Sequence, residues 1–100
     1  MTSETNQTIE LVRTMTGAEA AALRQSFLEA RGQAVSVDAS SVDHIGAQCL
    51  QVLVAAARAW RDEQKPMTID NPTAAFCEGI SRLGITMNEL TVDQNAGEAA

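Results

Sequence analysis

The sequence has few cations and few of the residues that build metal or disulfide sites. It contains seven Lys and Arg residues against thirteen Asp and Glu residues, for a formal net charge of −6. A protein that neutralises phosphates needs a cluster of cations, so the composition argues against a nucleic-acid partner. With one histidine and two cysteines at no ligand spacing, we expect no metal site, no cofactor and no disulfide framework. Cys49 and Cys77 are expected to be reduced, buried thiols.

The chain also lacks a long apolar run and the basic and apolar regions of a secretory signal peptide. We therefore expect a cytoplasmic protein that does not insert into a membrane. Its length of 100 residues fits one domain. We place that domain at residues 8–92, between polar segments at residues 1–7 and 93–100 that we expect to be disordered tails.

Three short segments have the composition of strands. Residues 8–12 and 67–69 are rich in β-branched side chains, and residues 34–37 are mostly apolar, as in a central, buried strand. Residues 38–46 have the composition of a polar loop. Residues 90–92 form either an edge strand or a docked tail, and the pattern is too short to choose between them.

Apolar residues at intervals of three and four predict three helices between and after these strands. The first helix begins at a capping box formed by Thr16 and Glu19. The third begins with Asn71 as its cap and Pro72 at its first position. The helices are predicted over residues 17–31, 47–62 and 72–83. The alternation indicates an α/β fold, with a small mixed or parallel sheet and helices packed against it.

The second predicted helix has more apolar surface than one buried face requires. Leu50, Leu53 and Ala57 share the face that we expect to pack on the sheet. Three of the four residues on the opposite face are apolar, and their small side chains would let another backbone approach closely. This opposite face consists of Gln48, Val52, Ala55 and Ala59. It is either a partner surface or a consequence of the high helix propensity of alanine, and the pattern alone leaves both open.

Candidate catalytic groups are few and do not converge. His44 follows Asp43, but neighbours in a loop need not face each other, so a solvated or capping histidine is favoured over an acid–base pair. Ser40 and Ser41 carry hydroxyls that could be phosphorylated, although the added charge would lie near acidic residues, and whether either is modified stays open. Trp60 is either a lid on the core or a contact for a partner. We expect no enzyme activity.

Residues 35–56, VSVDASSVDHIGAQCLQVLVAA, resemble the strand, loop and helix start of STAS domains, the anti-sigma-factor-antagonist family. Asp38-Ala39-Ser40 stands where that family has Asp-Leu-Ser, and Leu50 stands where it has the leucine after a glycine. Residues 66–85, PMTIDNPTAAFCEGISRLGI, are similar to the last strand and helix of the family. The resemblance implies a STAS-like fold, with the first strand of the usual N-terminal hairpin missing.

The chain departs from the phosphorylated members of that family at the start of the second helix. Where they have Asp, then the phosphorylated Ser or Thr, and two positions on a Gly, this chain has Gly46, Ala47 and Cys49. Alanine has no oxygen that accepts a phosphoryl group, so position 47 cannot be such a switch. The variant stretch GAQCLQVL is similar to that of small STAS proteins encoded with bacterial chemotaxis genes.

That subgroup binds the chemotaxis histidine kinase, so the resemblance implies a non-enzymatic adaptor in two-component signalling that modulates phosphate flow. An anti-sigma-factor antagonist or a lipid-transport STAS subunit is the alternative of the same kind. A small-ligand or nucleotide-binding module is the alternative from another class, and the sequence indicates no pocket for it. We expect the partner to bind the second helix and the loop before it. The predicted contact residues are His44, Ile45, Gly46, Gln48, Gln51, Val52, Ala55 and Ala59.

Overall fold

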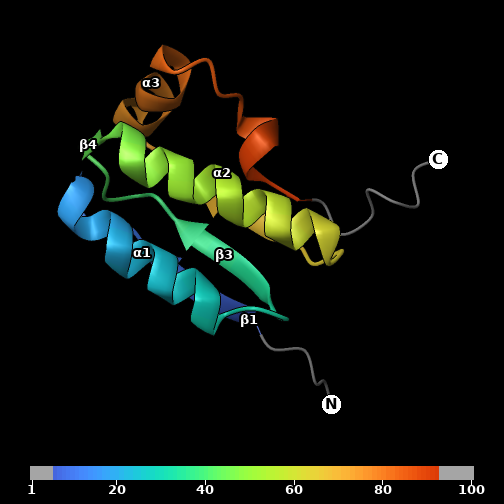
Figure 1. Cartoon of the computed structure of the whole chain (residues 1–100). Helices are drawn as coiled ribbons and strands as arrows, with labels where there is room; N and C mark the ends of the chain where they lie inside the picture. The colour runs from blue at the N-terminus through green and yellow to red at the C-terminus, as the bar shows by residue number, and fades with distance from the viewer. Residues whose placement is uncertain (1–5, 93–100) are drawn as a thin grey trace.

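The computed structural model describes residues 6–92 of the chain (Figure 1). The elements are β1 (Asn6–Glu10), β2 (Thr14–Met15), α1 (Gly17–Glu29), β3 (Ala34–Asp38), β4 (His44–Ile45), α2 (Ala47–Asp62), β5 (Met67–Asp70), α3 (Ala74–Arg82) and a short 3-10 helix, η1 (Met87–Leu90). The chain is thus a small α/β fold, as the alternation of patterns predicts.

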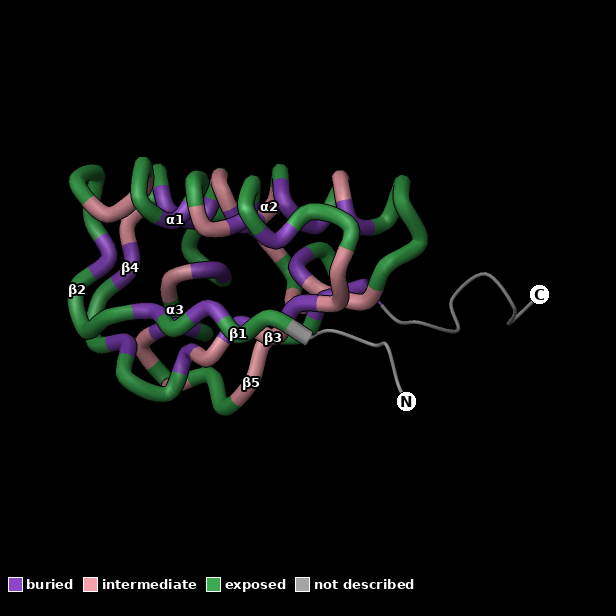
Figure 2. Tube along the Cα trace, turned by 90° about the horizontal axis from the view of Figure 1, so that it is seen from below, coloured by how far each residue is buried: buried purple, intermediate pink, exposed green. Residues whose placement is uncertain are grey.

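The main sheet has the strand order β1-β3-β5, and both pairs are parallel. The chain crosses from β1 to β3 through α1, and from β3 to β5 through α2. Two crossovers of the same hand that step in the same direction place both helices on one face of a sheet. Figure 2 shows α1 and α2 together on one side of the three strands. This topology sets the two helices beside each other.

The central strand, β3, shows why the helices cover only that face. Val35 and Val37 are buried, and Ser36 between them is half-buried. Ser36 lies in register between Thr8 of β1 and Thr68 of β5, both of which are exposed. Successive side chains of a strand point to opposite faces, so the valines lie in the core and the hydroxyl row lies on the other face. The prediction that residues 34–37 form the central strand is confirmed.

A second, two-stranded parallel sheet joins β2 to β4 beneath the first turns of the helices. Met15 and Ile45 pair within it and are both buried. The prediction of a polar loop over residues 38–46 is therefore wrong at its end, where the last residues form β4. Strands of two residues are too short for an alternation to be visible in the sequence.

The third helix begins two residues later than predicted. Thr73, and not Asn71, is its cap: the Thr73 hydroxyl accepts a hydrogen bond from the Phe76 amide at 3.1 Å and donates one to the Val42 carbonyl at 2.7 Å. Asn71 instead has a φ of 53°, in the left-handed region that asparagine tolerates in turns. Pro72 precedes the cap and is outside the helix, so α3 begins at Ala74.

The first strand begins at Asn6, so the predicted tail over residues 1–7 is too long by two residues. The rest of that segment, and the tail predicted over residues 93–100, lie outside the described residues. The backbone of Val92 exchanges two hydrogen bonds with that of Met67, at 3.0 and 2.9 Å, in an isolated antiparallel bridge. Leu90 before it is completely buried. The last described segment is thus a docked one, with a single bridge to the edge of the sheet.

Both cysteines are free thiols, but their environments differ. Cys49 of α2 is buried, as predicted, whereas Cys77 of α3 is exposed. The prediction of a buried Cys77 is wrong because the core face of this short helix is occupied by Phe76 and Ile80. None of the described helices combines the length and the apolar character needed to cross a membrane.

Candidate protein-interaction site

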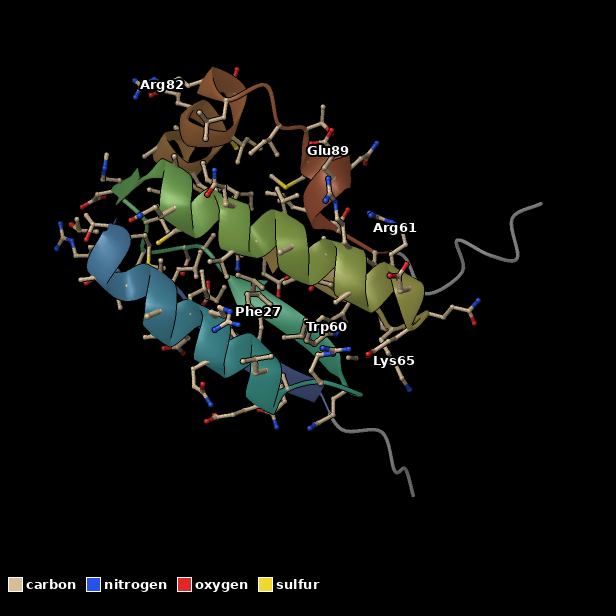
Figure 3. All side chains as sticks on the ribbon, viewed as in Figure 1. Phe27, Trp60, Arg61, Lys65, Arg82 and Glu89 are labelled. Carbon is tan, nitrogen blue, oxygen red and sulfur yellow. The ribbon has the colours of Figure 1, made fainter. Side chains whose placement is uncertain are left out.

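An open groove of about 580 Å³ lies between α1 and α2. Phe27 of α1 and Trp60 of α2 form its floor, and their rings meet edge to face with centroids 5.6 Å apart. Figure 3 shows both side chains between the two helices. Trp60 is completely buried, and its indole N–H donates a hydrogen bond to the Gln33 carbonyl at 2.8 Å. Trp60 is therefore a lid on the core, and the space above it is open.

One wall of the groove is the face of α2 that lies opposite the core stripe. We call Gln48, Val52, Ala55 and Ala59 the α2 wall, and Gln51 lies at its outer edge. Ala55 is exposed, and Val52 and Ala59 are half-buried against the core. Five of the eight predicted contact residues thus line a single groove. That a partner binds them stays a prediction.

The other wall comes from α1, and sequence reasoning missed it. We call Gly17, Ala21, Arg24 and Leu28 the α1 wall. Leu28 is 45% exposed, a high value for so large an apolar side chain. The sequence signal that could have found this wall is the spacing of its residues, at intervals of four, three and four, which is the same as on the α2 wall. Arg24 interrupts the apolar pattern, and only the packing of the two helices brings the two rows together.

The loop residues before α2 are not part of the groove. His44 is exposed on β4, and Ile45 is 6% exposed. The Ile45 side chain packs in the core beside Gly79 of α3, and its role as a contact residue stays a prediction. Gly46 is half-buried and its amide donates to the Met15 carbonyl at 2.8 Å. A role for His44 or Gly46 in binding stays a prediction.

The groove carries positive charge in an acidic protein. Two arginines and no carboxylate line it, whereas the whole chain has a formal net charge of −6. The Arg31 guanidinium forms an ion pair with Glu63 and lies 6.0 Å from the centre of the Trp60 ring. This pairing lowers the pKa of the Glu63 carboxyl and raises that of Arg31. Arg24 forms no salt bridge with the carboxylates that the structure describes.

Ala47, which the sequence resemblance aligns with the family phosphoacceptor, is exposed at the first turn of α2. Two residues on, the Cys49 thiol donates a hydrogen bond to the Thr16 carbonyl at 3.1 Å. Burial, and to a smaller extent the negative charge of Glu19, raise the pKa of the Cys49 thiol. A thiol that stays protonated is a poor nucleophile. The start of α2 thus offers neither a phosphate acceptor nor an activated cysteine.

The remaining candidate groups are engaged in local contacts or exposed. The Asp43 carboxylate pairs with Arg13 at 2.9 Å and not with the neighbouring histidine. Hydrogen bonding by Ser40, through its side chain first and then through its amide, lowers the pKa of the Asp38 carboxyl, and the amide lies 3.0 Å from a carboxylate oxygen. Ser40 and Ser41 are exposed. Within residues 6–92, no three His, Cys, Asp or Glu side chains are grouped so that they could hold a metal ion.

The comparisons with known proteins give one result. The family model described as "Mlab, STAS domain" matches residues 2–91, which is most of the chain. No curated protein and no solved structure matches. STAS domains are generally non-enzymatic modules that bind or regulate other proteins. A largely apolar groove between two helices agrees with such a module. By its fold and by this match, the chain belongs to the STAS-domain family.

Proposed function

We propose that this protein is a non-enzymatic STAS adaptor of bacterial chemotaxis, which binds the chemotaxis histidine kinase through the α1–α2 groove and modulates phosphate flow. The observation that carries the proposal is that the predicted outer face of α2 forms one wall of an open, largely apolar groove. Burial of this apolar surface against a second protein removes it from water, which favours binding. The proposal places the protein in the cytoplasm with its kinase.

The choice of partner is supported by the start of α2. The stretch GAQCLQVL is similar to that of the STAS proteins encoded with chemotaxis genes, and Ala47 lacks the oxygen that a phosphorylated anti-sigma-factor antagonist uses. An adaptor without a phosphorylation switch acts through binding alone. Its effect on the kinase is then limited to the difference in its affinity for two kinase conformations.

The first test is direct binding to the purified kinase of the same organism. We expect Ala55→Arg and Ala59→Arg to abolish binding, because a long, hydrated cation on the α2 wall blocks close approach of a partner. Biolayer interferometry measures the affinity, and circular dichroism should give melts nearly the same as the wild type. Wild-type affinity in both variants would contradict the groove as the docking site.

Ala22→Arg is the matched control. Ala22 is an exposed alanine on α1 that does not line the groove. The same substitution there should leave binding unchanged. If the wild-type protein does not bind the kinase, the chemotaxis assignment is wrong, and the alternatives of an anti-sigma-factor antagonist or a lipid-transport subunit take its place.

The second test concerns phosphate flow. With the kinase, a response regulator and ATP, addition of the wild-type protein should change the lifetime of the phosphorylated regulator. Ala55→Arg should have no such effect, because it does not bind. Radiolabelled phosphotransfer gives the readout, and equal lifetimes with and without the wild-type protein would contradict a role in phosphate flow.

A further inference from the structure

We propose that the occupant of the groove is one amphipathic helix of the partner, with acidic side chains along one edge of its apolar stripe. The inference rests on the proposed function and deepens it, because it assigns the chemistry of the kinase segment that binds. It also assigns contacts to the α1 wall, which the contact residues predicted from the sequence, on α2 and its preceding loop, do not include.

The spacing of the two walls fits a helix. The four residues of each wall recur at intervals of four, three and four, which is the spacing of residues along the contact between two packed helices. Each wall spans twelve residues, or about 16 Å of helix from the first residue to the last. In Figure 1, α1 and α2 run side by side in the same direction, and both walls line the groove between them. A third helix of about three turns would contact both walls along its length.

Backbone hydrogen bonding favours a helix over an extended peptide. The groove is walled by two helices, whose backbone groups are mostly bonded within each helix. An extended segment laid between them would bury amides and carbonyls that find no partners there. A helix satisfies these groups within itself and presents only side chains to the walls. The small residues of the walls, Ala21, Ala55 and Ala59, leave room for larger apolar side chains of the occupant.

The positive charge of the groove favours acidic side chains along one edge of the bound helix. Arg24 lies in the middle of the α1 wall and forms no salt bridge with a described carboxylate. Arg31 lies at one end and is already paired with Glu63. A carboxylate on the occupant opposite Arg24 therefore gains an ion pair that the free protein does not make. A second copy of this chain fits poorly, because its own walls would bring arginine and no carboxylate to the contact.

The experiment measures binding to the full-length kinase at 50 and 300 mM NaCl. We expect Arg24→Glu to weaken the affinity about tenfold, mainly through slower association, and to remove much of the salt dependence. Arg82→Glu makes the same change of charge on α3, which lies on the far side of α2 from α1 in Figure 3, and should retain wild-type affinity. Circular dichroism melts check that both variants are folded.

Hydrogen–deuterium exchange of the kinase, with and without the wild-type protein, identifies the bound segment. We expect protection in one stretch with apolar residues at helical spacing and Asp or Glu beside them. Changing those acids to Lys should weaken binding of the wild-type protein and restore binding of the Arg24→Glu variant. Wild-type affinity of Arg24→Glu, or protection confined to an extended segment, would overturn the inference while kinase binding stands. A wild-type protein that does not bind the kinase removes the proposed function itself, which is a different result.

Discussion

Two contacts in this molecule, that of α3 with β4 and that of α1 with α2, are closed to different extents. On the side of α3, Gly79 lies so close to β4 that a Cβ atom there would be 2.7 Å from a methyl carbon of Ile45. On the side of α1, Phe27 and Trp60 fill the floor, and small residues above them leave a groove. Small side chains thus have opposite effects in the two places.

The difference follows from what sets the distance between elements. A small residue allows close packing only where no larger neighbour prevents the approach. Beside Gly79 the backbones meet, so the gap is closed. Between α1 and α2 the rings of Phe27 and Trp60 set the spacing, and the alanines of the walls above them cannot reach across it. Small residues therefore allow close packing of α3 on β4, whereas between α1 and α2 they leave a groove.

The largest expected effect comes from removing the floor. Trp60→Ala should lower the free energy of unfolding by about 3–5 kcal/mol, because it leaves a cavity between the helices and deletes the hydrogen bond to Gln33. Urea unfolding measures the loss. Leu28→Ala at the exposed rim is the control and should cost less than about 1 kcal/mol. Equal losses at both positions would show that the groove has no distinct floor.

A glycine pair tests the contrast between closed and open sides directly. Gly79→Ala should cost about 1–3 kcal/mol, because the new methyl group meets the buried Ile45 side chain, and this exceeds the gain in helix propensity. Gly17→Ala meets only the end of the exposed, flexible Gln48 side chain and should change stability by no more than about 0.5 kcal/mol. Thermal unfolding measures the stability of both variants. A Gly79→Ala variant as stable as wild type would contradict the close contact between α3 and β4.

The start of α3 gives a smaller expected effect. Thr73→Ala should cost about 1 kcal/mol, because the variant loses the cap of the Phe76 amide and the bond to Val42. Thr86→Ala is the matched control, since Thr86 is exposed and makes no side-chain capping bond to η1. Chemical unfolding distinguishes them. A loss in the control as large as in Thr73→Ala would contradict the assignment of the cap.

The smallest expected effect concerns the ion pair at the end of the groove. Arg31 lowers the pKa of the Glu63 carboxyl below its ordinary value of 4.5, so this group contributes stability above about pH 4.5. Its contribution is lost as the pH falls through the lower pKa of the folded state. Wild type should therefore be slightly more stable than Glu63→Gln at pH 7, and the difference should shrink as the pH is lowered below 4.5.

Urea unfolding at a series of pH values measures this difference. Glu89→Gln is the control, because it removes an exposed carboxylate that forms no salt bridge within the described residues. The difference in stability between wild type and Glu89→Gln should not change as the pH is lowered below 4.5. If the difference in free energy of unfolding between wild type and Glu63→Gln grew as the pH was lowered, the result would contradict a lowered pKa of Glu63.

Much of this molecule is determined by local sequence. The periods of three and four residues, the capping box at Thr16 and the apolar run at residues 34–37 predict the three helices, the central strand and the α/β class. The outer face of α2 could also be predicted, because a helical wheel depends only on the order of residues along one helix. Sequence also showed that position 47 cannot accept phosphate.

Only the tertiary structure shows that the outer face of α2 forms one wall of a groove. Ile45 is apolar and belongs to a loop pattern, and nothing local reveals that a strand of two residues and Gly79 draw it into the core. The residues of the α1 wall have a helical spacing in the sequence, but they become one side of a groove only when two crossovers place α1 beside α2. Periodicity follows from bonds between residues close in the chain, whereas a groove depends on contacts between residues far apart in it.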